Sequence, residues 1–318
     1  MEASEMIRIE NIVKDYGSLR AVDHLNFQIN DGEILGFLGP NGAGKSTTLK
    51  MITCFLEPTE GNIYVDNYNV LEHSIEVRKM IGYLPEQNPL YDDMIVYDYL
   101  KFIANIRGIS ENNFKRRLEE VIDKTGLHGV ISKPIHTLSK GYRQRTGLAQ
   151  AILHDPKILI LDEPTNGLDP NQIIEIRELI KELGKEKTLI ISSHILQEVQ
   201  AVCERIVIIN KGKLVADGST EELQSGIEHK TRLHLELAAP ESDISLIPQN
   251  IPEVSIVSLE NKNDYIKAVL EYPKEQDKRP EIFKFIKTQP WTLLEMHRVT
   301  FSLEDVFRNL TSENGGNK

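Results

Sequence analysis

The spacing of hydrophobic residues changes several times along the chain, and each spacing predicts a different kind of element. Ile7 and Ile9, and later Phe27 and Ile29, alternate with polar residues. This alternation is typical of strands with one buried face, and a polar turn at 15–18 separates the two segments. We therefore expect antiparallel strands near the start of the chain.

Apolar segments without alternation predict buried parallel strands further along. Residues 158–161 and 189–191 are continuously apolar, and between them Ile173, Ile176 and Ile180 recur at helical spacing. Strands that alternate with helices in this way are typical of βαβ units. The core sheet is therefore predicted to be mostly parallel.

A helical pattern lies between these two regions. Within residues 96–127, Phe114 and Leu118 recur at helical spacing among Lys, Arg and Glu. This pattern predicts an amphipathic helix. We expect a helical insert over about 90–155, inside a first domain of residues 1–224.

The remaining residues, 225–311, predict a small α+β domain. Its expected elements are strands 233–237, 254–259 and 265–271, helix 280–288, strand 293–296 and helix 303–310. The last residues, 312–318, contain no apolar side chain, so we expect them to be disordered.

Composition narrows the possible function. A chain of 318 residues is long for one domain, which agrees with the two predicted above. The net charge of -11 argues against a general nucleic-acid binder, because neutralising phosphates requires an excess of lysine and arginine. Cys54 and Cys203 show no disulfide or zinc-binding spacing, which fits a reducing compartment.

The chain also shows no sign of membrane insertion in its sequence. No apolar run approaches the roughly 18 residues that a membrane span requires, and the first residues lack the order of a signal peptide. We expect a cytoplasmic protein whose membrane role, if it has one, passes through a partner.

The first chemical motif is a glycine-rich loop between strand 33–38 and helix 48–53. It has the Gly-x-x-x-x-Gly-Lys-Ser spacing of a phosphate-binding loop and contains Gly39, Pro40, Asn41, Gly42, Ala43, Gly44, Lys45, Ser46 and Thr47. Glycines in such loops let backbone N–H groups turn onto a phosphate chain at a helix N-terminus. We expect Lys45 to reach the β and γ phosphates of ATP and Ser46 to bind Mg²⁺.

Two carboxylates follow the apolar segment 158–161. Asp162 stands at the end of this strand, where it can orient Mg²⁺, and Glu163 comes next. A carboxylate at the second position is suitably placed to polarise a water molecule for attack on the γ-phosphate. Either residue by itself is also common at a strand end.

A second anion-binding pattern is the sequence Leu-Ser-Lys-Gly-Tyr at 138–142. Ser139, Lys140 and Gly141 precede helical residues 146–153, so a hydroxyl and a glycine stand at a helix N-terminus. By itself this pattern is also compatible with ordinary helix capping.

Taken in order, these motifs resemble those of ATP-binding-cassette (ABC) ATPases. The phosphate loop, Leu-Ser-Lys-Gly-Tyr, Leu-Asp-Glu-Pro at 161–164, Gly-Leu-Asp at 167–169 and Ser-His at 193–194 follow the order of that family over residues 7–224. The resemblance implies an α/β fold with a mostly parallel P-loop ATPase core, an antiparallel β subdomain and a helical insert. In this chain the predicted small α+β domain follows the ATPase domain.

The resemblance further implies a head-to-tail dimer, in which each ATP lies between the phosphate loop of one subunit and Ser139–Gly141 of the other. Tyr16 is similar to the residue that stacks on adenine. His194 is similar to the switch histidine that contacts the γ-phosphate and holds Glu163. Asp169 is similar to a loop aspartate that reaches across the dimer. From the residues alone, Tyr16 is also compatible with simple packing, His194 with a structural role and Asp169 with a helix N-cap, and the two roles of Asp169 can coexist.

Two positions depart from the family pattern. The family's glutamine that senses Mg²⁺ and water follows a strand like 82–85, and that register here holds Glu86, with Gln87 next to it. Either side chain is a candidate for the role. Lys140 replaces a glycine of many members and adds a cation that we expect to help hold phosphate charge.

Residues 302–311 resemble the closing segment of ATPases that serve ABC-2 type exporters, and the chain as a whole is similar to ATP-binding subunits associated with bacterial gliding motility. We therefore expect an ATPase that powers separately encoded polytopic membrane permease subunits and does not bind nucleic acid. Two alternatives stay open. One is a soluble ABC ATPase that acts on ribosomes or DNA, and the other is an importer ATPase.

Overall fold

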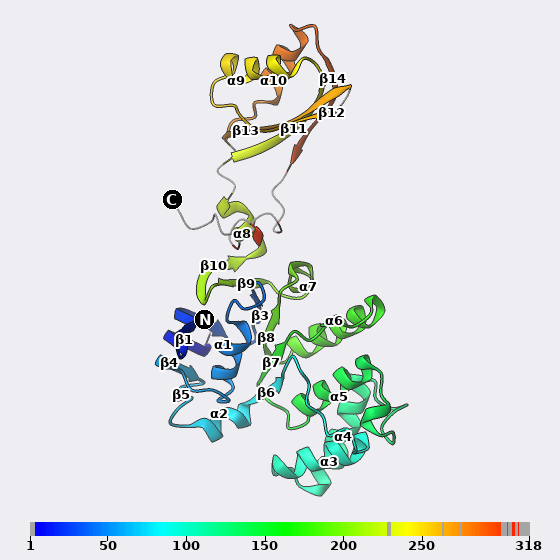
Figure 1. The fold of residues 1–318 in the computed structure, drawn as a ribbon. Helices are drawn as coiled ribbons and strands as arrows, with labels where there is room; N and C mark the ends of the chain where they lie inside the picture. Colours follow the sequence, from blue (N-terminus) through cyan, green and yellow to red (C-terminus); the bar gives the residue numbers. More distant parts are fainter. Residues whose placement is uncertain are drawn as a thin grey trace. The chain divides into compact units, whose positions relative to one another are not determined.

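The computed structural model describes residues 4–227, 230–262, 264–273 and 275–299, together with residues 304, 307, 308 and 311. The chain divides between Ser219 and Thr220 into two compact units, each with its own hydrophobic core (Figure 1). The boundary expected from the sequence, at 224, falls inside helix α8 (Thr220–Ile227).

A six-stranded sheet forms the centre of the first unit. Its order is β10-β9-β3-β8-β7-β6, and every neighbouring pair is parallel except β9 with β10. The strands are β3 (Ile34–Leu38), β6 (Ile81–Leu84), β7 (Ile158–Asp162), β8 (Thr188–Ser193), β9 (Arg205–Asn210) and β10 (Lys213–Ser219). Every residue of β7 and β8 is buried, as expected for parallel strands with both faces covered. The predicted parallel core is confirmed.

Four helices directly precede or follow strands of this sheet. They are α1 (Lys45–Ile52), α2 (Ser74–Met80), α6 (Pro170–Gly184) and α7 (Leu196–Gln200). Of these, α6 and α7 connect consecutive strands of the sheet. The helix predicted from the spacing of Ile176 and Ile180 is α6, which buries both side chains. The βαβ pattern expected from the sequence is therefore present.

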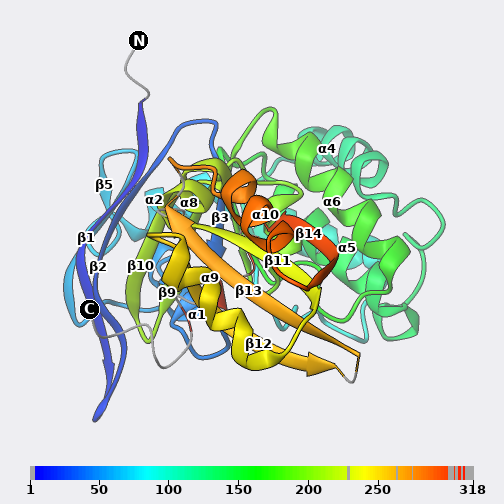
Figure 2. The ribbon, with the colours of Figure 1, turned by 90° about the horizontal axis from the view of Figure 1, so that it is seen from above.

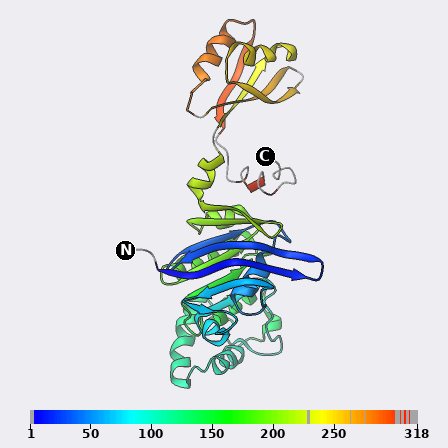
Figure 3. The same cartoon turned by 90° about the vertical axis from the view of Figure 1, so that its left-hand side faces the viewer.

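The predicted antiparallel strands form a second sheet of the first unit. Its order is β2-β1-β4-β5, with β1 (Glu5–Tyr16), β2 (Leu19–Asn30), β4 (Glu60–Val65) and β5 (Tyr68–Asn69). The two long strands, in dark blue in Figure 3, pair so that Ile7 faces Ile29 and Ile9 faces Phe27. Phe27 stacks on Phe37 of β3, with ring centroids 5.5 Å apart. The two sheets therefore share one core.

The helical insert differs from the prediction in one respect. It contains α3 (Val96–Ile106), α4 (Glu111–Thr125), the short 3₁₀ helix η1 (Ile135–Thr137) and α5 (Lys140–Ile152). The prediction of one amphipathic helix over 96–127 is wrong, because the chain turns at Gly108, whose φ of 69° is left-handed. Phe114 and Leu118 do lie on the buried face of α4, at the predicted spacing.

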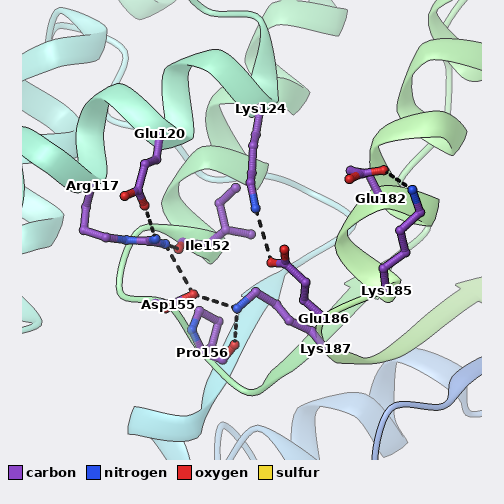
Figure 4. A network of polar contacts seen from close by, with 10 residues as sticks. All are labelled: Arg117, Glu120, Lys124, Ile152, Asp155, Pro156, Glu182, Lys185, Glu186 and Lys187. Atoms are coloured by element: carbon purple, nitrogen blue, oxygen red, sulfur yellow. Dashed lines mark hydrogen bonds and ion pairs between the residues drawn. The ribbon is translucent and has the colours of Figure 1, made fainter.

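Charged side chains join this insert to the central sheet (Figure 4). Arg117 of α4 donates a hydrogen bond to the Ile152 carbonyl oxygen and lies 3.5 Å from the Asp155 carboxylate. Lys187, which is buried just before β8, donates to Asp155 at 2.7 Å and to the Pro156 carbonyl oxygen at 2.8 Å. Asp155 is therefore the shared partner of a helix of the insert and of a residue that directly precedes an interior strand of the sheet.

The second unit contains a four-stranded antiparallel sheet with α9 and α10 on one face (Figures 1 and 2). After α8 its elements are β11 (Lys230–Ala238), the 3₁₀ helix η2 (Glu241–Ser245), α9 (Leu246–Asn250), β12 (Ser255–Lys262), β13 (Tyr265–Pro273), α10 (Arg279–Lys287) and β14 (Thr292–Val299). Leu235, Leu270 and Ile282 belong to its core. This is the small α+β fold predicted from the sequence. The helix expected at 303–310 lies largely outside the described residues, and the tail 312–318 lies wholly outside them.

The contacts of Asp155 make the stability of the protein depend on pH. Partial burial raises the pKa of this carboxyl group, but the hydrogen bond from Lys187 and the charge of Arg117 lower it more, so the pKa lies below the ordinary 3.8. A folded-state pKa below the unfolded one gives stability that is present above 3.8 and is lost as the pH falls through the folded-state pKa.

We therefore predict that Asp155→Asn lowers the free energy of unfolding by about 1 kcal/mol at pH 7, because it removes the charge that faces Lys187. The effect is modest since the Asp155 side chain is 61% exposed and solvent screens it. Asparagine tolerates the left-handed backbone at this position, where φ is 55°. Urea unfolding followed by circular dichroism measures the difference. Equal stability of the two proteins at pH 7 would contradict the prediction.

Candidate nucleotide site

The phosphate loop lies between β3 and α1. Gly44, the N-cap of α1, has a φ of 104°, and a side chain there would come within 2.5 Å of the Ala21 carbonyl oxygen. Gly42 is also left-handed, with a φ of 79°. These two positions therefore require glycine. The loop leads into the N-terminus of α1, where free N–H groups and the helix dipole favour a bound phosphate.

A cavity of about 200 Å³ lies beside this loop. Its lining residues are Asn41, Gly42, Ala43, Lys45, Ser46, Glu86 and Glu163. All of them are candidate site residues from the sequence. The fold therefore brings the loop, the carboxylate after β7 and residue 86 to one place.

Lys45 is buried at the wall of this cavity. Its Nζ donates to the carbonyl oxygen of Gly39 at 2.8 Å and to that of Pro40 at 3.4 Å. It also lies 3.3 Å from Oε1 of Glu163, and both side chains are only 6% exposed. Charges are less screened in such a buried place than in water. The loop carbonyls and Glu163 therefore hold the cation where an anion in the cavity can reach it.

Glu163 is held in an unusual conformation. Its backbone φ is 49°, which is uncommon for a residue other than glycine and is often found at functional sites. While Oε1 faces Lys45, Oε2 lies 2.9 Å from Nδ1 of His194. The carboxylate is therefore fixed from two sides. In this position it can accept a proton from a water molecule in the cavity.

Ser192, near the end of β8, bonds to both acidic residues at the end of β7. Its Oγ accepts a hydrogen bond from the Glu163 N–H at 2.9 Å and donates one to Oδ1 of Asp162 at 2.5 Å. Ser192 is completely buried. Sequence reasoning missed this residue, and the only signal for it was a serine pair that ends an apolar strand just before His194.

Residue 86, rather than 87, faces the phosphate cavity. Glu86 lines this cavity and accepts a hydrogen bond from Nδ2 of Asn166 at 3.3 Å. Gln87 does not line it, but lines a neighbouring cleft of about 710 Å³. Ser46 and Glu86 line both spaces. The contact from Asn166 was also missed from the sequence.

The oxygen donors at this junction suit Mg²⁺. Ser46, Asp162 and Glu86 all line the larger cleft. Proteins usually bind Mg²⁺ through one or two carboxylates together with substrate phosphates. Within the described parts of the chain, no group of three or more His, Cys, Asp and Glu side chains is arranged to hold a metal. The hydroxyl and carboxylate donors fit a cation that is shared with a phosphate group.

The second motif lies at the start of α5, outside the phosphate cavity. Ser139 is the N-cap of α5, and its Oγ accepts a hydrogen bond from a backbone N–H of the first turn at 3.4 Å. Gly141 packs against Gln172, whose Cδ would lie 2.6 Å from a Cβ at this position. The Lys140 ammonium lies directly against Gly167. The motif is thereby packed onto the first turn of α6 and the loop that precedes it.

Two further candidates also lie away from the cavity. Asp169 is the N-cap of α6, and its Oδ1 accepts a hydrogen bond from the Gln172 N–H at 3.0 Å. Tyr16 ends β1 and is 46% exposed, with the Lys14 ammonium 5.6 Å from its ring centroid. Neither Asp169 nor Tyr16 lines the two spaces described above. Within one chain, the nucleotide-binding candidates therefore fall into separate groups.

Comparison with known proteins identifies the family. The family model described as ABC transporter matches residues 22–166. The chain is 33% identical to YhcH, an uncharacterized ABC transporter ATP-binding protein of Bacillus subtilis (strain 168), over 97% of this chain and 96% of that protein. The chain belongs to the ABC transporter ATP-binding proteins. This ABC protein is also 36% identical to the bacitracin transport ATP-binding protein BcrA of Bacillus licheniformis, over 88% of this chain and 90% of BcrA.

Solved structures agree with this assignment. One is the dimeric structure of a post-hydrolysis state of the ATP-binding cassette MJ0796 bound to ADP and Pi. Its TM-score is 0.62 at 27% identity, over 67% of this chain and 98% of the cassette. As a member of this family, the protein binds and hydrolyses ATP. No helix in the described residues is long and apolar enough to cross a membrane.

The contacts of Ser192 predict its effect on stability. Ser192→Ala leaves the buried N–H of Glu163 without its acceptor, so we expect the free energy of unfolding to fall by about 1–3 kcal/mol. Thermal or urea unfolding measures this, and Ser192→Thr, which keeps a hydroxyl, is the matched control. Unchanged stability in the alanine variant would show that the bridge from the Asp162 carboxylate to the Glu163 N–H is not needed.

Proposed function

We propose that this ABC ATPase is the energy-supplying subunit of an ABC-2 type exporter and acts on separately encoded membrane permease subunits at the inner face of the cell membrane. The bacitracin transport relative supports this proposal, because the similarity covers 88% of the chain and so reaches into the second unit. A role in gliding motility stays a prediction, since neither of the two relatives described above is named for it.

We also propose that two copies pair head to tail. The observation that carries this proposal is that Ser139, Lys140 and Asp169 are exposed and line no part of the phosphate cavity in their own chain. We expect them to complete the cavity of the second copy, so that each ATP lies between two chains. The dimeric cassette with ADP and Pi, to which this fold is similar, supports such an arrangement.

In this proposal the residues of the cavity divide the work of hydrolysis. The loop N–H groups and Lys45 bind the phosphates, and Glu163 orients the attacking water and accepts its proton. His194 holds the Glu163 carboxylate and contacts the γ-phosphate. Ser46 and Asp162 would hold Mg²⁺, which would supply positive charge against the β and γ phosphates. Glu86 completes the oxygen donors.

Lys140 is proposed to add a cation to the completed site. It is exposed at the N-terminus of α5, and within the described residues its ammonium makes no ion pair. Its charge adds to the partial positive charge of the helix N-terminus. We expect it to lie near the phosphates of the nucleotide that the second copy holds. Tyr16 is proposed to stack on the adenine.

The larger cleft is the proposed contact with the permease. Phe55, Phe102 and Ile106 line it and are exposed. Lys50 and Arg78 also line it, which suits an apolar segment with acidic residues. Since Ser46 and Glu86 line both this cleft and the phosphate cavity, a segment bound here sits next to the nucleotide. This neighbourhood gives a route by which ATP binding can change the permease.

Two substitutions separate binding from chemistry. Glu163→Gln removes the proton acceptor but keeps the shape, so we expect ATP binding with at least a hundredfold lower turnover and accumulation of an ATP-bound dimer in size-exclusion chromatography. Lys45→Ala removes the cation that faces the phosphates, so nucleotide binding itself should weaken. Turnover at the wild-type rate in the glutamine variant would refute the role of Glu163.

Co-purification tests the transport role. The tagged protein from gently solubilised cells should bring down a polytopic membrane protein identified by mass spectrometry. Phe55→Glu places a charge in the cleft and should abolish this while ATP binding persists, whereas Leu71→Glu, at an exposed position outside the cleft, should not. Recovery of ribosomes or DNA instead of a membrane protein would favour the soluble alternative. The direction of transport into inside-out vesicles distinguishes export from import.

A further inference from the structure

Glu86 is the charged residue that the phosphate cavity and the larger cleft share. Ser46 and Glu86 line both spaces, whereas Glu163 lines only the cavity and Asp162 only the cleft. Three carboxylates therefore surround the place where the phosphates and the cation of a nucleotide are proposed to bind. Their charges are balanced by the protein to different degrees.

The protein balances the charge of Glu163 but not that of Glu86. Glu163 faces Lys45 at 3.3 Å and His194 at 2.9 Å. Glu86 accepts a hydrogen bond from the neutral amide of Asn166, and in the described parts of the chain no lysine or arginine forms an ion pair with it. Glu86 thus adds a negative charge to a cavity in which Lys45, the one cation among the described lining residues, already has a carboxylate partner.

We infer that Glu86 makes nucleotide binding depend on a divalent cation more strongly than a neutral side chain at this position would. An uncompensated carboxylate repels the phosphates of ATP when no metal is present. A divalent cation between them turns this repulsion into attraction, because both the phosphates and the carboxylate face its positive charge. Binding of the metal and binding of the nucleotide then favour each other. The inference rests on the proposed binding of ATP in this cavity.

The negative charge of Glu86, rather than its oxygen atoms, is expected to cause the stronger metal dependence. Glutamine at position 86 keeps the length and one oxygen donor of the side chain but carries no charge. Glu86 is exposed, so this substitution leaves no buried group without a partner. One charge lies several ångströms from the phosphates, at an effective dielectric constant between that of protein and that of water. Removing it is expected to change the dissociation constant without metal about tenfold.

The test is equilibrium binding of a fluorescent, slowly hydrolysed ATP analogue, with Mg²⁺ or with EDTA at matched ionic strength. The measured quantity is the ratio of the two dissociation constants, without and with metal. We expect Glu86→Gln to lower this ratio about tenfold relative to wild type, mainly because binding without metal becomes tighter. An unchanged ratio would overturn the inference.

The neighbouring glutamine provides the matched control. Gln87 lines the cleft but not the phosphate cavity, so the double variant Glu86→Gln, Gln87→Glu keeps the net charge and moves the carboxylate away from the cavity. We expect this variant to show the low ratio of Glu86→Gln. A wild-type ratio in the double variant would show that the position of the charge does not matter, and would overturn the inference.

The outcomes separate this inference from the proposed function. A wild-type protein that binds no nucleotide under either condition overturns the proposed function, and the inference with it. Nucleotide binding by the wild type that Lys45→Ala weakens, together with an equal metal dependence in wild type and Glu86→Gln, overturns the inference alone. A lower metal dependence in Glu86→Gln supports both.

Discussion

The ion pair between Lys45 and Glu163 is the interaction on which the site depends. It joins the phosphate loop after β3 to the end of β7, two strands that are not neighbours in the sheet, because β8 lies between them. The intervening strand contributes as well, since Ser192 bonds to the Asp162 carboxylate and to the Glu163 backbone N–H, and His194 at its end contacts the Glu163 carboxylate. Residues at the ends of three strands, β3, β7 and β8, therefore determine the position of the Glu163 carboxylate. The left-handed backbone of Glu163 is maintained by these contacts.

The same geometry leaves part of the nucleotide-binding chemistry unused within one chain. The N-terminus of α5, with Ser139 and Lys140, packs onto the start of α6 through Gly141 and onto the preceding loop at Gly167, away from the phosphate cavity. Gly141 is buried in these close contacts, whereas the neighbouring Ser139 and Lys140 are exposed to solvent. This exposure agrees with a role of the motif in binding a second copy. In this account the ATPase activity requires the association of two chains. A permease bound in the larger cleft would act on Ser46 and Glu86, which also line the phosphate cavity.

The sequence predicted the parts of this arrangement that depend on local patterns. Continuous apolar segments indicated β7 and β8, and glycine spacing indicated the phosphate loop. The break at Gly108 was missed because helical spacing continues on both sides of it. Short elements such as β5 and α9 carry too few residues for a period. Ser192 and Asn166 could not be assigned, because their roles arise from strands and loops that meet only in the folded chain. Glu86 and Gln87 could not be distinguished for the same reason, since adjacent residues of a loop point in directions that only the fold determines.

The central claim is that each nucleotide site is built from two chains. Mixing two inactive variants tests this claim most directly. Lys45→Ala disables the phosphate loop, and Ser139→Arg blocks the motif at α5. In a head-to-tail dimer of one chain of each kind, both defects fall in one site and the other site is intact. The account predicts that the mixture regains single-turnover ATP hydrolysis that neither variant shows alone. A mixture that hydrolyses no more ATP than the two variants measured separately would contradict it.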